Sequence, residues 1–408
     1  MSPLETTFRE AGGRVTSALA AAFRDLDLAE EAFAEACARA VERWGAAPPA
    51  DPAAWLYAVA RRWAVDRLRR RATAAGYRPE APEPEPTPEE HAMRLDEPIP
   101  DERLRLIFVC CHPAVAAEAR APLTLKTVCG LSTAEIARAF LISEPTLAQR
   151  LVRAKRKIAE AGVPFETPGP ERWPERMEAI LSTLEVAYAQ AHADAALAGP
   201  HAAFAAEMLR LSALLARLAP RDAEAQALAA TLHLTESRRA ARLDAEGAMV
   251  PLTAQDVRDW DADLMARGRA WLATSAELSR QAATPPGPRA LQAAVHAAHA
   301  SRRESGITPW RDVCALYDAL LSRRDDAVVR TNRAVALAEV EGAAAGLAAL
   351  DAVAATGWLP FHAARADLLA RLDRRAEAVA EYDLALAAGP QVAEERFLRR
   401  RRAASVGG

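Results

Sequence analysis

Apolar residues recur at three- and four-residue spacing along nearly the whole chain, and this periodicity limits the possible folds more than any other feature. No segment shows the strict apolar–polar alternation of a half-buried strand. Alanine is abundant and aromatic residues make up only 5% of the chain, which favours closely packed helices over sheets. We therefore predict an all-α protein, and its 408 residues leave room for two or three domains.

Proline and charge divide these predicted helices into blocks. Seven prolines lie among glutamates between Pro79 and Pro100, a composition typical of an extended, semi-rigid linker. Further proline clusters begin at Pro164 and Pro285. The predicted segments are a first helical module at 1–76, the linker at 77–100, a second helical module at 101–162, a helical extension at 163–285 and helical repeats at 286–408.

Several classes of protein are excluded by composition. No apolar run of 18 residues exists and the first residues are polar, so we expect neither a membrane span nor a signal peptide. Five cysteines, an odd number without C-x-x-C spacing, suit a reducing cytoplasm. The net charge of −3 does not by itself point to a nucleic-acid partner, but the charged residues are unevenly distributed along the chain.

The first two strongly amphipathic segments differ in charge. Residues 25–44 carry an apolar stripe opposite acidic side chains, and Asp51-Pro52 is a good start for the following helix. That helix is basic and interleaves arginines with aromatic rings, as binding of single-stranded or opening DNA requires. A solvated arginine face at a helix C-terminus is the alternative. The residues concerned are Trp55, Tyr57, Arg61, Arg62, Trp63, Arg67, Arg69, Arg70 and Arg71.

Residues 131–158 have the pattern of a helix-turn-helix. Ser132 or Thr133 caps the first helix, and Ser143 caps the second, which has Pro145 in its first turn. One side of the second helix is apolar, and the opposite side is polar and basic, which suits entry into a DNA major groove. An ordinary basic helix surface is the alternative. The outward-facing residues are Thr146, Gln149, Arg150, Arg153, Arg156 and Lys157.

The C-terminal segment contains a faint internal repeat. Its small–aromatic–small–proline spacing matches the second helix of a tetratricopeptide repeat, a unit that is stable only in an array. An irregular helical bundle with coincidental alanines remains the alternative. The matching positions are Ala366, Ala378, Tyr382, Ala385 and Pro390, with a weaker copy at Gly346, Leu350 and Val353.

The order of these parts resembles extracytoplasmic-function sigma factors of the sigma-70 family, in the subgroup with a C-terminal helical extension. The segments that resemble region 2 of these proteins are LAEEAF at 28–33, WLYAVA at 55–60 and Asp66-Arg67. Those that resemble region 4 are DERLRLIFVCCHP at 101–113 and the helix-turn-helix. The subgroup is indicated by AQRLVRAKRK at 148–157, Gln255-Asp256, Trp260-Asp261, LQAA at 291–294, NRAV at 332–335 and RADLL at 365–369.

This resemblance implies a subunit that directs bacterial RNA polymerase core to promoter DNA. Asp27, Glu30, Glu31 and Arg39 would dock on the β′ clamp, and the apolar side of the helix-turn-helix would meet the β-flap. The basic helix, through Arg61, Arg62, Trp63, Arg67, Arg69 and Arg70, would hold the unwound −10 element together with the loop 45–51. The outward face of the second module would read the −35 element. We expect a cytoplasmic, nucleoid-associated protein whose extension regulates it in cis and binds a protein or peptide partner.

Other chemistry has weaker support in the sequence. Adjacent Cys110 and Cys111 point about 100° apart on a helix, so buried structural thiols are favoured over a metal or redox site with His112 and Cys129. His296 and His299 have a spacing compatible with zinc, but without an evident third ligand we expect them to pack. No catalytic motif or phosphate-binding loop occurs, so we predict no enzyme activity, cofactor or metal.

Two other kinds of protein remain possible from the sequence. A one-component regulator would use the helix-turn-helix on operators and the C-terminal repeats as a sensor, but it leaves the basic helix at 55–71 unexplained. A repeat scaffold would have a protein as its main partner and would tolerate neutralisation of Arg153 and Arg156.

Overall fold

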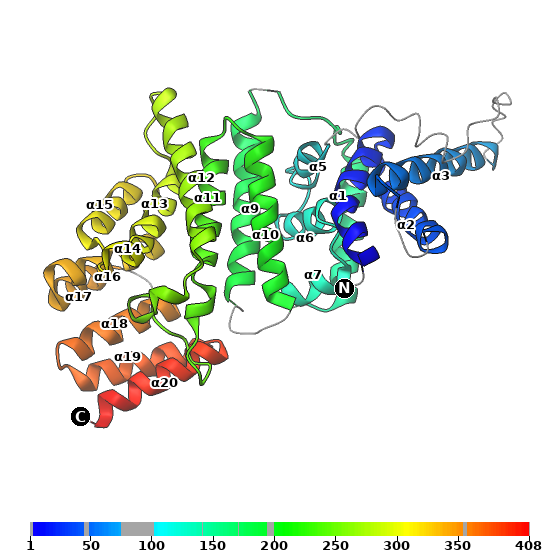
Figure 1. The fold of residues 1–408 in the computed structure, drawn as a ribbon. Coiled ribbons are helices and arrows are strands. Elements are labelled where there is room, and N and C mark those ends of the chain that lie inside the picture. The colour runs from blue at the N-terminus through cyan, green and yellow to red at the C-terminus, as the bar shows by residue number, and fades with distance from the viewer. Residues whose placement is uncertain are drawn as a thin grey trace. The chain divides into compact units, whose positions relative to one another are not determined.

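The computed structural model describes residues 3–44, 49–74, 102–140, 142–169, 171–193, 200–353 and 357–407. Within these ranges the chain is helical and contains no strand, apart from an isolated bridge between Leu243 and Met249, so the all-α prediction is confirmed. The predicted linker at 77–100 lies outside the described residues, as do Leu141 and most of the loop at 45–51. Two compact units, residues 1–187 and 188–408, divide the chain, and the boundary falls within helix α9 (Figure 1).

The first module of unit 1 is a bundle of three helices whose ends follow from local sequence. Asp25 caps the second helix by accepting from the amide of Leu28 at 3.0 Å, and Asp51 accepts from the amide of Ala54 at 2.9 Å at the start of the third. Alanines and leucines on the inner face of the second helix are fully buried. The helices are α1 (Pro3–Phe23), α2 (Leu26–Arg43) and α3 (Pro52–Ala74).

The second module of unit 1 contains the predicted helix-turn-helix. Ser132 and Glu135 form a capping box, in which each side chain bonds the other's backbone amide, at 3.1 and 2.8 Å. Ser143 caps the next helix by accepting from the amide of Thr146 at 3.3 Å. The elements are α5 (Arg103–Cys110), α6 (Ala117–Val128), α7 (Thr133–Ala139) and α8 (Glu144–Glu160), followed by α9 (Trp173–Ala193).

The two modules of unit 1 contact each other through α1, which packs against α5 and α6 as well as against α2 and α3. Gly13 lies at the closest point, because a β-carbon there would overlap with the carbonyl oxygen of Val128 in α6. Ser17 on the same helix donates to the carbonyl of Gly13 at 2.6 Å and is fully buried. Close approach of the backbones therefore depends on glycine at position 13.

Unit 2 is a succession of helices, and no described helix of the chain is long and apolar enough to cross a membrane. The segment between α11 and α12 contains short 3-10 turns and the isolated bridge. The main helices are α10 (Pro200–Leu218), α11 (Ala223–Glu236), α12 (Ala262–Gln281), α13 (Pro288–Ala300), α15 (Trp310–Leu321), α16 (Ala327–Glu341), α17 (Ala343–Asp351), α18 (Leu359–Arg371), α19 (Arg375–Ala387) and α20 (Val392–Gly407).

Successive pairs of helices pack side by side at the C-terminal end, α16 on α17, α18 on α19, and α19 on α20, as Figure 1 shows. Gly346 allows α17 to approach α16, since an added β-carbon would lie 2.5 Å from that of Ala338. Ala366, Ala378 and Tyr382 are almost completely buried in the shared core. The predicted helical hairpins are therefore present, and their assignment to the tetratricopeptide type stays a prediction.

Candidate nucleic-acid interface

The C-terminal half of α3 presents the predicted basic surface. Arg61, Arg67 and Arg70 are exposed, as is Arg71, while Arg62, Trp63 and Arg69 are partly buried. The guanidinium of Arg67 lies 5.8 Å from the ring centre of Trp63, so the ring is flanked by a cation. A partly buried indole beside several exposed cations can stack on a base while its neighbours contact phosphates.

Trp55 does not belong to this surface, which corrects its assignment as a stacking residue. Only 7% of Trp55 is exposed, and its ring meets Trp44 edge-on at a centroid distance of 5.3 Å. Phe8 of α1 lies against the same Trp44 at 5.7 Å. Trp55 is therefore a core residue of the first module, and Tyr57 and Trp63 are the partly exposed aromatic residues of α3.

Helix α8 separates an apolar face from a polar one as predicted. Leu147, Leu151, Ala154 and Ile158 are buried against the rest of the module. On the opposite side Thr146, Gln149, Arg153, Arg156 and Lys157 are exposed, and Arg150 is partly buried. All six predicted residues therefore lie on α8 outside its buried stripe, and their contact with DNA stays a prediction.

Local contacts order several of these side chains without removing them from solvent. Arg150 donates from Nη1 to the carbonyl of Glu118 at 3.4 Å, which ties α8 to α6. Arg156 and Lys157 share Glu160, at 3.4 and 2.8 Å, and these exposed pairs contribute little to stability. Their cations therefore remain available for exchange to phosphate groups.

Val152 is a surface residue of α8 that the sequence pattern did not single out. It is 65% exposed and lies three residues after Gln149 and four before Arg156, on the same face. The signal was an apolar residue on the polar side of the helical wheel. An exposed valine at that place offers an apolar contact for a thymine methyl group.

The residues predicted to dock on polymerase lie on α2 and differ in their surroundings. Glu31 is exposed, and Arg39 forms an ion pair with Glu35 at 2.9 Å one turn earlier in the same helix. Asp27 and Glu30 instead contact the second module: Nζ of Lys155 in α8 lies 2.8 Å from Asp27 Oδ1 and 2.7 Å from Glu30 Oε2.

The Lys155 contact is partly shielded from water. The side chain of Lys155 is 13% exposed and that of Glu30 25%, whereas Asp27 remains largely accessible. Burial acts to lower the pKa of Lys155, but the charges of Glu30 and Asp27 outweigh it and raise the pKa above its ordinary value. Sequence reasoning missed this pair because nothing in either helix alone indicates a contact across more than a hundred residues.

Cys110, Cys111 and His296, considered in the sequence as metal or redox candidates, have protein partners. Cys110 Sγ lies 3.2 Å from Thr127 Oγ1 and Cys111 Sγ 3.6 Å from Thr124 Oγ1, and burial raises the pKa of both thiols. His296 accepts at Nδ1 from Arg238, a neighbour that disfavours a metal ion there. Among the described residues no group of His, Cys, Asp and Glu converges as a metal site.

An all-α chain with a helix-turn-helix and a second basic helix has the build of a DNA-binding protein. Residues 7–73 match the family described as sigma-70 region 2, and residues 105–158 match sigma-70 region 4. Residues 176–276 match a family of unknown function, DUF6596. An uncharacterized protein of Rhizobium meliloti (strain 1021) is 39% identical over 386 residues, which cover 92% of this chain and 90% of the relative. No solved structure matches the chain.

The chain belongs to the sigma-70 family, as an extracytoplasmic-function-type sigma factor with a C-terminal extension. Sigma factors of this kind bind RNA polymerase core and promoter DNA to initiate transcription, and no catalytic domain is matched. The region 2 match also accounts for the basic helix α3, which a one-component regulator would leave without a role.

Proposed function

We propose that α8 reads the −35 element in the major groove and that α3 holds the unwound −10 element. The observation that carries this proposal is the exposed polar face of α8, set opposite a fully buried apolar stripe. Glutamine and arginine on that face have the hydrogen-bonding geometry to select adenine and guanine, and Val152 adds an apolar contact. The arginines of α3 supply sequence-independent contacts to phosphates.

Replacement of Gln149 and of Arg70 by alanine separates these two roles. We expect Gln149→Ala to reduce discrimination at one −35 position by roughly 1–3 kcal/mol, because a base-edge contact is lost. We expect Arg70→Ala to weaken promoter binding for every −35 sequence and to lower its salt dependence, because a phosphate contact is lost. The measurement is in vitro transcription with core polymerase on a set of −35 variants. Equal effects of the two substitutions on all templates would contradict the assignment.

For the polymerase interface we propose that Asp27, Glu30, Glu31 and Arg39 of α2 dock on the β′ clamp and that the apolar side of the helix-turn-helix meets the β-flap. The ion pairs of Lys155 bear on this proposal, because they occupy two of the four side chains. Polymerase and α8 would compete for Asp27 and Glu30. The free protein is then a closed form, which core polymerase must open before it binds.

We further propose that the C-terminal extension regulates promoter use in cis, in place of a separate inhibitory protein. Support comes from the start of α9, which packs on the second module. The ring of Trp173 lies 5.1 Å from that of Phe108 in α5, and Arg176 donates from Nη2 to the carbonyl of Phe108. Helix α9 begins against region 4 and continues along the chain across the boundary between the two units. In this role the protein would be cytoplasmic and associated with the nucleoid.

Truncation after Ala193 tests the regulatory role, because it removes nearly all of unit 2 while retaining the contact of Trp173 with Phe108. We expect the truncated protein to give higher promoter output in vitro than the full chain, since the restraint is removed. Trp173→Ala in the full chain serves as the comparison, because it loosens α9 from α5 without deleting unit 2. Equal output from the truncated and full chains, with both proteins monodisperse, would exclude regulation in cis.

A further inference from the structure

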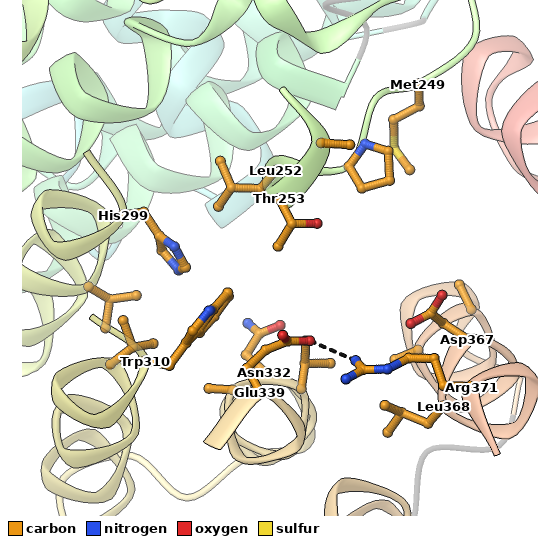
Figure 2. A pocket seen from close by; sticks show the side chains of 18 of the residues that line it. Met249, Leu252, Thr253, His299, Trp310, Asn332, Glu339, Asp367, Leu368 and Arg371 are labelled. Atoms are coloured by element: carbon orange, nitrogen blue, oxygen red, sulfur yellow. Dashed lines mark hydrogen bonds and ion pairs between the residues drawn. The ribbon is translucent and has the colours of Figure 1, made fainter. Parts of the chain in front are cut away.

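Unit 2 contains a pocket of about 630 Å³, within the range that small-molecule sites occupy. Its walls come from the loop at 249–254 and from helices α13, α15, α16 and α18, together with residues of α19 and α20. Figure 2 shows His299 and Trp310 on one side of the space, and Asp367, Leu368 and Arg371 on the other.

Arg302 holds in place the loop at 249–254, which forms one wall of the pocket. Arg302 donates to the carbonyls of Leu252 and Thr253 at 3.0 and 2.9 Å and to that of Gln255 at 2.5 Å, and its guanidinium lies 5.1 Å from the ring centre of Trp260. Because the loop's backbone is fixed by side-chain hydrogen bonds, the pocket exists before any ligand arrives.

The charged groups at the far side of the pocket neutralise one another. Glu339 forms an ion pair with Arg371 at 2.6 Å, drawn as a dashed line in Figure 2, and Asp367 forms one with Arg401. These two carboxylates and two guanidinium groups leave no net charge on that side.

Arg238 is the remaining cation of the pocket lining, and it lacks a carboxylate partner among the described residues. It is only 8% exposed. Its Nη2 donates to Nδ1 of His296 at 3.2 Å, and its Nη1 is buried without any hydrogen-bond partner. Burial lowers its pKa to about 10, which still leaves it charged at neutral pH. Burial of a guanidinium without a counter-ion costs free energy, and a bound anion would offset that cost.

The surroundings of Arg238 are aromatic and apolar. Trp310 and Tyr317 are partly exposed toward the pocket, with buried Val295 and Val313 beside them. His299 meets Trp310 edge-on at 5.3 Å. Burial, together with the charges of Arg238 and Arg302, lowers the pKa of His299 to about 4, so this imidazole is neutral at neutral pH and adds no second cation.

We propose that this pocket binds a small organic monocarboxylate, whose carboxylate pairs with Arg238 and whose apolar or aromatic body lies against Trp310 and Tyr317. One unmatched cation calls for one negative charge, and a guanidinium suits a planar carboxylate through paired hydrogen bonds. The volume of the pocket and its mixed lining suit a molecule of metabolite size.

Binding is tested on the full chain, without polymerase or DNA, so the result does not depend on the proposed promoter contacts. The probes are phenylacetate and indole-3-acetate, with phenylacetamide and indole-3-acetamide as neutral isosteres, in calorimetry and thermal unfolding. We expect the carboxylates to bind and to raise Tm, and the amides to bind at least about 30-fold more weakly, because they leave the buried cation unpaired. A short peptide with a free C-terminal phenylalanine carboxylate is tested in the same two measurements, for comparison with the small carboxylates.

Arg238→Gln is expected to abolish the carboxylate-induced shift in Tm, whereas Arg258→Gln should retain it. Arg258 is a suitable control because its side chain is 87% exposed and paired with Asp256, outside the pocket lining. A purely structural Arg238 would change the Tm of the free protein and leave the ligand-induced shift intact. That result would overturn the proposal, as would equal binding of acids and amides, binding of the peptide alone, or no binding up to about 10 mM.

Discussion

Charge reversal at Lys155, in the variant Lys155→Glu, is expected to open unit 1 and to tighten binding of core RNA polymerase. The variant replaces two attractive contacts, with Asp27 and Glu30, by repulsion between carboxylates. The contact with Glu30 carries most of the effect, because Asp27 is 70% exposed and its pairing is screened by water. The expected gain in core affinity is roughly 5–150-fold, the usual range of a coupling of about 1–3 kcal/mol.

Two measurements on the free and bound protein check this expectation. Energy transfer between dyes on α3 and α8 should fall in the Lys155→Glu variant, and fluorescence titration should give the higher affinity for core polymerase. Lys157→Glu is the matched control. It makes the same charge change on the same helix, but Lys157 pairs with Glu160 of α8 itself and not with the first module. Unchanged energy transfer in Lys155→Glu, or an equal gain in affinity in Lys157→Glu, would show that the ion pairs do not hold the modules together.

Local sequence patterns predicted most of what lies within one helix or one turn. Asp51, Ser132 and Ser143 cap helices as expected, because a cap depends on residues within one turn of it. The two faces of α8 also followed from periodicity, since one helix packed on one side must bury its apolar stripe.

Contacts between distant segments were beyond the reach of such patterns. Trp55 looked like a stacking surface among arginines, but its burial depends on Trp44, which caps the C-terminus of α2. Lys155 and Arg238 look like ordinary basic residues in sequence, and their significance comes from neighbours that only the tertiary structure supplies. Whether a charge is paired, exposed or buried alone is a property of the packing, so the candidate pocket was not predictable from composition.

Gly13→Ala should also open the modules, by a steric effect that leaves every charge in place. The added β-carbon would overlap with the carbonyl oxygen of Val128, a backbone atom that cannot move without shifting α6. Alanine is also a better helix former than glycine, so α1 itself should remain stable while its packing against α6 is lost. We expect a gain in core affinity of the same order as that from Lys155→Glu.

Gly12→Ala is the control for the steric effect. Its β-carbon would meet ring atoms of Phe33 at 3.2 Å, within the first module, and would leave the contact with α6 intact. If the closed form is a single state held by both contacts, the double variant Gly13→Ala/Lys155→Glu should bind core polymerase no more tightly than the stronger single variant, because a form that is already open cannot be opened again. Fully additive gains in the double variant would mean that the two residues act on polymerase separately.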